Sequence, residues 1–130
     1  MREESNWFEF AREDLIVAKA SLEKGVYNQA CFHSHQGVEK MLKGYLAAKN
    51  KDIPKTHFIG VLLKLCAQMD EKFKGLIGRC IKLDDYYIPT RYPDALPGAL
   101  AESLPTKEDA EEALLILEEA IDFVKKSLRN

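Results

Sequence analysis

The chain has 130 residues, of which 46% are hydrophobic and 31% are charged, and its formal net charge is -2. This length suits one domain with its own core, and the composition excludes a disordered protein and one whose whole surface is a cationic footprint for nucleic acid. No apolar run approaches the roughly 18 residues of a membrane span, and acidic residues stand where a signal peptide would be basic. We therefore predict a single cytoplasmic domain over residues 1–130, with no membrane association.

The first half of the chain predicts two long helices. Apolar residues recur at steps of three and four over residues 6–24, and Gly25 ends this pattern. A second, longer helix is predicted over residues 28–50. Within it, Gly37 and Gly44 lie seven residues apart and so share one face, where the missing side chains would let a neighbouring helix come close.

The second half predicts further helices around one long irregular segment. Thr56 is a plausible cap for a helix over residues 57–69, and another helix is predicted over residues 70–84. Residues 86–105 are rich in proline and tyrosine and break every helical pattern, whereas the last helix opens at Thr106, with Asp109 placed to complete the cap. The inner face expected for the third helix consists of Phe58, Val61, Leu62 and Leu65.

No segment alternates with period two for long enough to form a strand. The predicted fold class is therefore all-α: an antiparallel up-and-down bundle of four to five helices, with a long Pro/Tyr-rich loop before the last helix.

The residue types that usually signal catalysis or metal binding do not form recognisable patterns. Cys31, Cys66 and Cys80 are widely spaced and lie at apolar helical positions, so we expect small buried hydrophobic side chains. His33 and His35 are separated by about 200° around a helix and cannot hold one metal ion together. We find no nucleophile triad and no phosphate-binding loop. We assign no catalytic residue, no metal and no cofactor.

Charge is distributed unevenly along the chain. Residues 40–64 contain six lysines and one aspartate, a net charge of +5, whereas residues 102–122 contain eight acidic residues and one lysine, a net charge of -7. Such polarity suits a cationic patch for phosphate, or oppositely charged surfaces that pair between subunits. The alternative is that the charges only complement helix dipoles. We expect acid pairs such as Asp84 and Asp85 to be solvated or helix-end charges.

Two segments carry candidate ligand-binding residues. Gln36, Lys40 and Lys43 follow one another at steps of four and three, so they share a helix face that either lines an anion-binding groove or is a polar surface stripe. In the long loop, Arg91 lies next to Tyr92, between prolines. Such an arginine either binds a phosphate bidentately, stacks on an aromatic ring, or anchors the loop to the bundle.

These residues resemble the HEPN family, the helical nucleotide- or RNA-associated domain of prokaryotes and higher eukaryotes. The resemblance rests on the pattern H-Q-x-x-E-K-x-L-K from His35, on Pro54–His57, and on T-R-Y-P from Thr90, with Trp7 and Asp14 on the first helix. It implies an antiparallel helical bundle, commonly a homodimer, that pairs with a small nucleotidyltransferase in toxin–antitoxin-like settings. It also implies that many members are metal-independent ribonucleases, with an arginine followed four to six residues later by a histidine.

None of the five arginines of this chain is followed by a histidine at that spacing. The leading hypothesis is therefore a non-catalytic HEPN-like domain that forms a homodimer and binds a nucleotide or RNA phosphate, a nucleotidyltransferase partner, or both. The alternatives are a metal-independent ribonuclease with a non-standard residue set, using His35 or His57 with Arg91, and a pure dimerisation or adaptor module. The candidate ligand-binding positions are Gln36, Lys40, Lys43, His57, Arg91 and Tyr92.

Overall fold

The computed structural model describes residues 3–86 and 104–129, and within them it contains helices and no strand. This confirms the predicted all-α bundle. The α-helices with bounds inside these residues are α1 (Glu3–Glu23), α2 (Tyr27–Ala48), α3 (Ile59–Met69), α4 (Lys74–Cys80) and α6 (Lys107–Arg129). The fourth predicted helix is divided: α4 is flanked by the 3-10 helices η1 (Glu71–Phe73) and η2 (Ile81–Leu83). The greater part of the predicted long loop, with Arg91 and Tyr92, lies outside the described residues.

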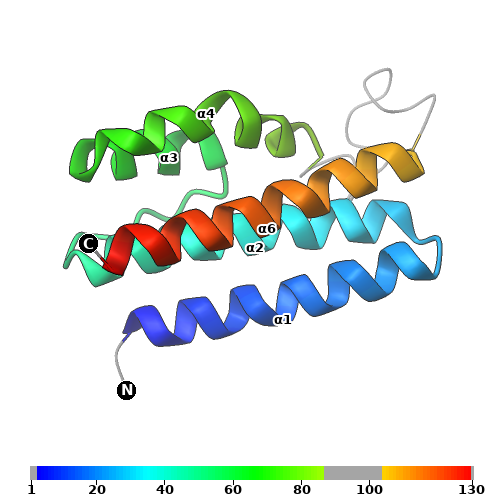
Figure 1. The fold of residues 1–130 in the computed structure, drawn as a ribbon, viewed down its shortest axis with the longest axis horizontal. Helices are drawn as coiled ribbons and strands as arrows, with labels where there is room; N and C mark the ends of the chain where they lie inside the picture. The colour runs from blue at the N-terminus through cyan, green and yellow to red at the C-terminus, as the bar shows by residue number, and fades with distance from the viewer. Residues whose placement is uncertain (1–2, 87–103, 130) are drawn as a thin grey trace.

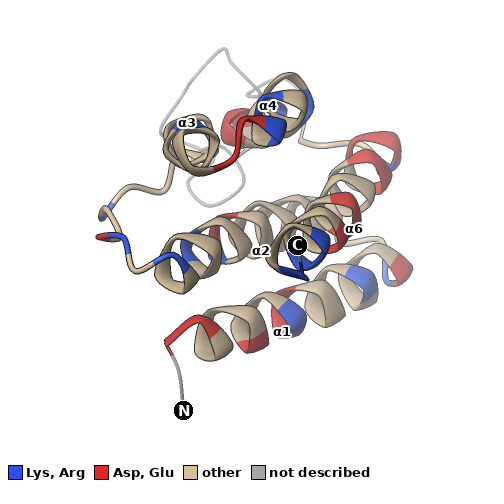
Figure 2. Cartoon of the chain, turned by 60° about the vertical axis from the view of Figure 1, so that its left-hand side comes forward, with Lys and Arg blue, Asp and Glu red and all other residues tan. Residues whose placement is uncertain are grey.

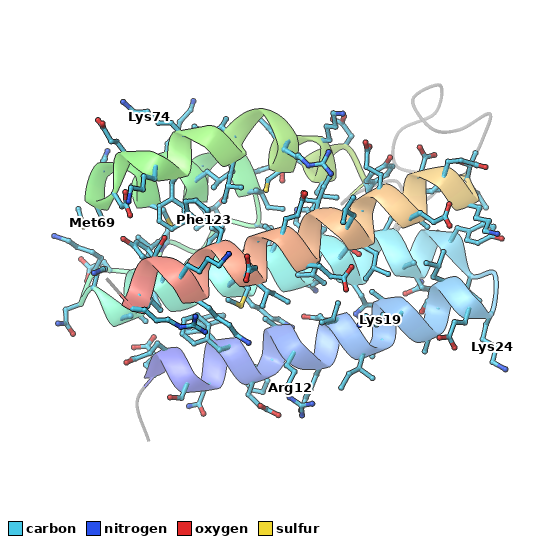
Figure 3. All side chains as sticks on the ribbon, viewed as in Figure 1. Arg12, Lys19, Lys24, Met69, Lys74 and Phe123 are labelled. Carbon is cyan, nitrogen blue, oxygen red and sulfur yellow. The ribbon has the colours of Figure 1, made fainter. Side chains whose placement is uncertain are left out.

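The helices form three layers, with α2 and α6 in the middle, α1 on one side, and α3 and α4 on the other (Figure 1). The hairpins α1/α2 and α3/α4 are antiparallel, whereas α6 runs beside α2 in the same direction (Figure 1). The connection over residues 49–58 leads back along α2, so that α3 starts level with the first half of that helix. Asp84, which lies just after η2, contacts both His35 of α2 and the first residue of α3. Figure 3 shows Phe123 reaching from α6 toward the α3/α4 layer, where it packs against Phe73 at a centroid distance of 4.9 Å.

The sequence correctly predicted the cap at the start of α6 and the glycine that ends α1. The backbone N–H of Asp109 donates to the Thr106 hydroxyl at 3.1 Å, and the N–H of Thr106 donates to the Asp109 carboxylate at 2.9 Å, which completes a reciprocal cap. Gly25 follows α1 with a φ of 76°, a left-handed conformation that glycine adopts without steric cost. α1 begins at Glu3, three residues before the predicted start.

The predicted cap and inner face of α3 are partly wrong. The Thr56 hydroxyl accepts a hydrogen bond from Phe58, but the first two N–H groups of α3 donate to the carboxylate of Asp84. Phe58 and Val61 are about half exposed. Apolar residues surround most of α3, so periodicity alone could not identify the face that packs on α2. The fully buried residues of α3 are Ile59, Leu62, Leu63 and Cys66.

The two glycines of α2 permit close packing, as predicted. A Cβ added at Gly37 would lie 2.6 Å from a methyl group of Leu117 on α6, and a Cβ at Gly44 would overlap the ring of Phe8 on α1. α2 is therefore in contact with helices on both sides and forms the centre of the core.

The three cysteines are free and buried, which confirms their predicted packing role. Burial is the largest cause that raises the pKa of each thiol to about 12, so all three stay protonated and unreactive near neutral pH.

Part of the acidic surplus of α6, visible in Figure 2, is paired within the molecule. Glu112, Glu118 and Glu119 of α6 form ion pairs with Lys82 of η2, Lys19 of α1 and Arg79 of α4. None of the described helices combines the length and the apolar character needed to cross a bilayer.

Candidate functional site

A buried carboxylate on α2 brings two of the predicted site residues together. Glu39 accepts a hydrogen bond from Lys43 Nζ at 2.8 Å, and His57 Nδ1 lies 3.2 Å from the same oxygen, Oε2. The Glu39 and Lys43 side chains are 5% and 8% exposed, whereas the His57 side chain is 56% exposed. We call Glu39, Lys43 and His57 the Glu39 cluster. Its acid is inside the protein and its imidazole faces the solvent.

Trp7 of α1 completes the surroundings of this cluster. Lys43 Nζ lies 5.7 Å from the centroid of the Trp7 ring, a cation–π distance. A Cβ at Gly44 would lie 3.0 Å from the Trp7 Cβ, so the absence of a side chain at position 44 lets α1 approach here. The buried ammonium of Lys43 is therefore held between a carboxylate and an aromatic ring.

Lys40, which shares the predicted stripe with Lys43, binds a different acid. Its Nζ donates to Asp14 Oδ2 of α1 at 2.7 Å, while His33 Nδ1 lies 2.9 Å from Asp14 Oδ1. Lys40 Nζ also lies 5.8 Å from the centroid of the Phe10 ring. Asp14 and Glu39 thus each engage one lysine and one histidine, and the two lysines lie on neighbouring turns of α2.

A third carboxylate–histidine pair lies on the α3 side of α2. His35 Nε2 lies 3.1 Å from Asp84 Oδ1, and the same carboxylate accepts hydrogen bonds from the N–H groups of Ile59 and Gly60 at 2.8 and 3.1 Å. Burial favours a higher pKa for Asp84, but the hydrogen bonds from His35 and the two amides outweigh it, so the pKa lies below its ordinary value. Asp84 therefore joins α2, α3 and η2 as a carboxylate.

The remaining predicted site residues are Gln36, Arg91 and Tyr92, and none of them is placed in the Glu39 cluster. Gln36 is half-buried on α2, one turn before Lys40. Arg91 and Tyr92 lie outside the described residues, so their position relative to Lys43 and His57 stays a prediction.

The family resemblance included Asp14 and Glu39, but sequence reasoning assigned no site role to them or to Asp84. The i,i+4 spacing of Glu39 and Lys43 could have revealed their pair. Asp14 and Asp84 meet their partners only through the tertiary fold, which local spacing does not show. Of the two alternatives predicted for Asp84, a solvated charge is wrong, because its side chain is only 15% exposed, whereas its carboxylate does lie at a helix end, the start of α3.

The Glu39 cluster has the composition of an acid–base or anion-binding site. A buried carboxylate fixes the ring of an exposed histidine, as in enzymes that use histidine to transfer protons. Lys43 and the imidazole supply two nitrogen donors beside one carboxylate. Within residues 3–86 and 104–129, no three His, Cys, Asp or Glu side chains gather where they could hold a metal ion. His33 and His35 contact acids on different elements, Asp14 of α1 and Asp84 after η2.

Comparisons with a family model, a relative and two solved structures agree on the same domain family. The family model for the HEPN domain matches residues 5–127. A protein of Methanocaldococcus jannaschii named "Putative toxin MJ1304" is 35% identical over 128 residues, which cover 92% of this chain and 84% of that protein. The crystal structure of TT1696 from Thermus thermophilus superposes with a TM-score of 0.82 and 38% identity, covering 97% of this chain and 98% of the other. ST0689, described as an archaeal HEPN homologue, gives a TM-score of 0.77 and 30% identity, with 98% of both chains covered.

Proposed function

This protein belongs to the HEPN domain family, and we propose that it is the toxin-like member of a toxin–antitoxin-type pair that binds the phosphate of a nucleotide or RNA through the Glu39 cluster. The name of the Methanocaldococcus jannaschii relative supports the toxin-like setting. The absence of an arginine followed four to six residues later by a histidine favours binding without catalysis.

The observation that carries this proposal is the convergence of Lys43 and His57 on Glu39. Glu39 holds both nitrogen groups in place, so a ligand does not have to order long, mobile side chains. His57 is the exposed member and makes the first contact with the phosphate, while Lys43, ion-paired to Glu39, balances the negative charge of that carboxylate beneath it. We assign Gln36 and Lys40 to the periphery of this site, and a role of Arg91 and Tyr92 in ligand binding stays a prediction from the sequence.

Isothermal titration with ATP, GTP and short RNA tests the proposal. We expect saturable binding to at least one of them, and we expect His57→Ala to weaken it about tenfold, the effect of losing one charge-assisted hydrogen bond. Lys55→Ala is the matched control, because Lys55 is an exposed cation two residues away that makes no ion pair with another described residue. Equal affinity of His57→Ala and the wild type would contradict the proposal that the ligand binds at the Glu39 cluster. If the wild type binds none of the three ligands, only the adaptor hypothesis is left.

We also propose that the protein forms a homodimer and pairs with a nucleotidyltransferase. Sedimentation equilibrium of the full chain measures the first part, and we expect a dimer at micromolar concentration. Co-expression with a nucleotidyltransferase encoded beside it measures the second. A chain that stays monomeric as its concentration rises would contradict the homodimer. Separate elution of the two proteins would contradict the pairing with the nucleotidyltransferase.

A second candidate function, a metal-independent ribonuclease, is favoured by one observation. Glu39 orients the exposed imidazole of His57 as a general acid or base requires, and Lys43 balances the charge of Glu39. Incubation of labelled RNA with the protein and EDTA tests this reaction. Cleavage that disappears in His57→Ala but persists in Lys55→Ala supports it, whereas no cleavage leaves phosphate binding alone.

A further inference from the structure

A hollow of about 350 Å³ lies between α1 and α6, apart from the three carboxylate–histidine groups. It is formed where the first turns of α1 and the last turns of α6 lie at the same end of the bundle (Figure 1). On α1, Phe8 and Leu15 supply its apolar lining. The volume is within the range of cavities that bind small molecules.

The hollow has an apolar floor and a polar rim. Met41 of α2 forms the floor, with Phe8, Leu15 and Ile121 on its sides. Met41 is 1% exposed and has a flexible thioether side chain that adapts to ligand shape. An aliphatic ligand body in this place would release water from apolar surface on both partners.

The rim presents one uncompensated positive charge. Arg12 is held by Glu9, with Nη2 2.6 Å from the carboxylate oxygen, so this pair adds no net charge. Lys125 of α6 lines the opposite side and forms no ion pair with any residue in 3–86 or 104–129. Ser5 adds a hydroxyl group at the mouth. A polyanion such as a nucleotide phosphate would meet an apolar wall and Lys125, which has no ion partner among the described residues, so this lining does not match several negative charges.

We propose that this hollow binds a small amphipathic carboxylate, with its aliphatic body against Met41 and its carboxylate at Lys125. The two parts of the ligand match the two parts of the site: its apolar surface meets the floor, and its one negative charge meets Lys125, which is unpaired among the described residues. The proposal does not depend on the Glu39 cluster, because none of the residues that line the hollow belongs to that cluster.

Isothermal titration of the full chain with octanoate and with octylammonium tests this inference. The two probes share an eight-carbon body and differ in the sign of the head group. We expect one octanoate to bind per chain, at least tenfold more tightly than octylammonium. Lys125→Glu should weaken octanoate binding about tenfold, and Ser5→Trp should abolish it by filling the mouth with an indole ring.

Lys126→Glu is the matched control, since Lys126 is the next residue, is exposed and does not line the hollow. It should bind octanoate as the wild type does. Thermal unfolding of each variant shows that it is folded. No saturable binding of octanoate by the wild type, equal affinity for the two probes, or unchanged binding in both Lys125→Glu and Ser5→Trp would overturn the proposal.

Discussion

One chemical theme, a carboxylate paired with a histidine, is used in opposite ways on two sides of α2. In the His35–Asp84 pair the imidazole is fully buried, and the acid also binds two backbone amides. In the Glu39 cluster the acid is buried, and the His57 imidazole faces the solvent. A buried histidine can bind only other parts of the protein, so it joins elements of the fold. Burying the acid instead leaves an oriented histidine exposed to the solvent.

The largest expected effect comes from truncating the two histidines in parallel. His35→Ala leaves a cavity and removes the partner of a mostly buried carboxylate, so we expect the free energy of unfolding to fall by about 4 kcal/mol. His57→Ala removes a solvent-exposed ring and should lower it by less than about 1 kcal/mol. Urea unfolding followed by circular dichroism measures both. Equal losses would contradict the assignment of one histidine to the fold and the other to the site.

The acid of the buried pair gives the next largest effect. Asp84→Ala removes the cap of α3 and leaves His35 buried without that carboxylate, which should cost about 3 kcal/mol of unfolding free energy. Asp85→Ala is the matched control, because the neighbouring side chain is exposed, and it should change stability by about 0.5 kcal/mol or less. A similar loss in both variants, in the same urea titration, would show that Asp84 has no special role.

A smaller effect is expected where α1 contacts α2 beside the Glu39 cluster. Gly44→Ala forces a methyl group against the Phe8 ring and should destabilise the protein by about 2 kcal/mol. Gly78→Ala in α4 meets no atom within 4 Å and should stabilise it by about 0.5 kcal/mol, as alanine favours the helix. Thermal unfolding distinguishes the two signs. A stabilised Gly44→Ala variant would mean that α1 does not pack closely at this point.

The smallest effect is the pH dependence that Asp84 contributes. Its pKa in the folded chain lies below the ordinary value of 3.8, so the ionised carboxylate stabilises the fold above that pH. This contribution is lost as the pH falls from about 4 through the lower folded pKa. We expect the unfolding free energy to decline less steeply in Asp84→Asn than in the wild type over that acid range. Urea titrations at several pH values measure this dependence. If the unfolding free energies of Asp84→Asn and the wild type fall equally steeply with pH, the Asp84 carboxylate does not stabilise the fold through its hydrogen bonds.

The features that sequence reasoning predicted correctly are those determined by neighbouring residues. The Thr106–Asp109 cap is complete within four residues, and the paired glycines of α2 are read from helix geometry alone. The cap of α3 was missed because Asp84 lies 25 residues after Ile59 and reaches it only when η2 folds back beside α2.

The candidate site shows the same division between local and tertiary information. Helical spacing correctly placed Lys40 and Lys43 on neighbouring turns of one face, but it could not show that they bind separate acids. Lys40 binds Asp14, 26 residues away on α1, whereas Lys43 binds Glu39 on its own helix. The convergence of His57 on Glu39 depends on the path of residues 49–58, which carry no periodic pattern.

The most direct test of the Glu39 cluster measures RNA affinity and unfolding free energy on the same samples of wild type, His57→Ala and Lys55→Ala. We predict that His57→Ala binds a short RNA about tenfold more weakly while its stability changes by less than about 1 kcal/mol, and that Lys55→Ala matches the wild type in both. Wild-type affinity in His57→Ala, or an equal loss of affinity in Lys55→Ala, would contradict the account.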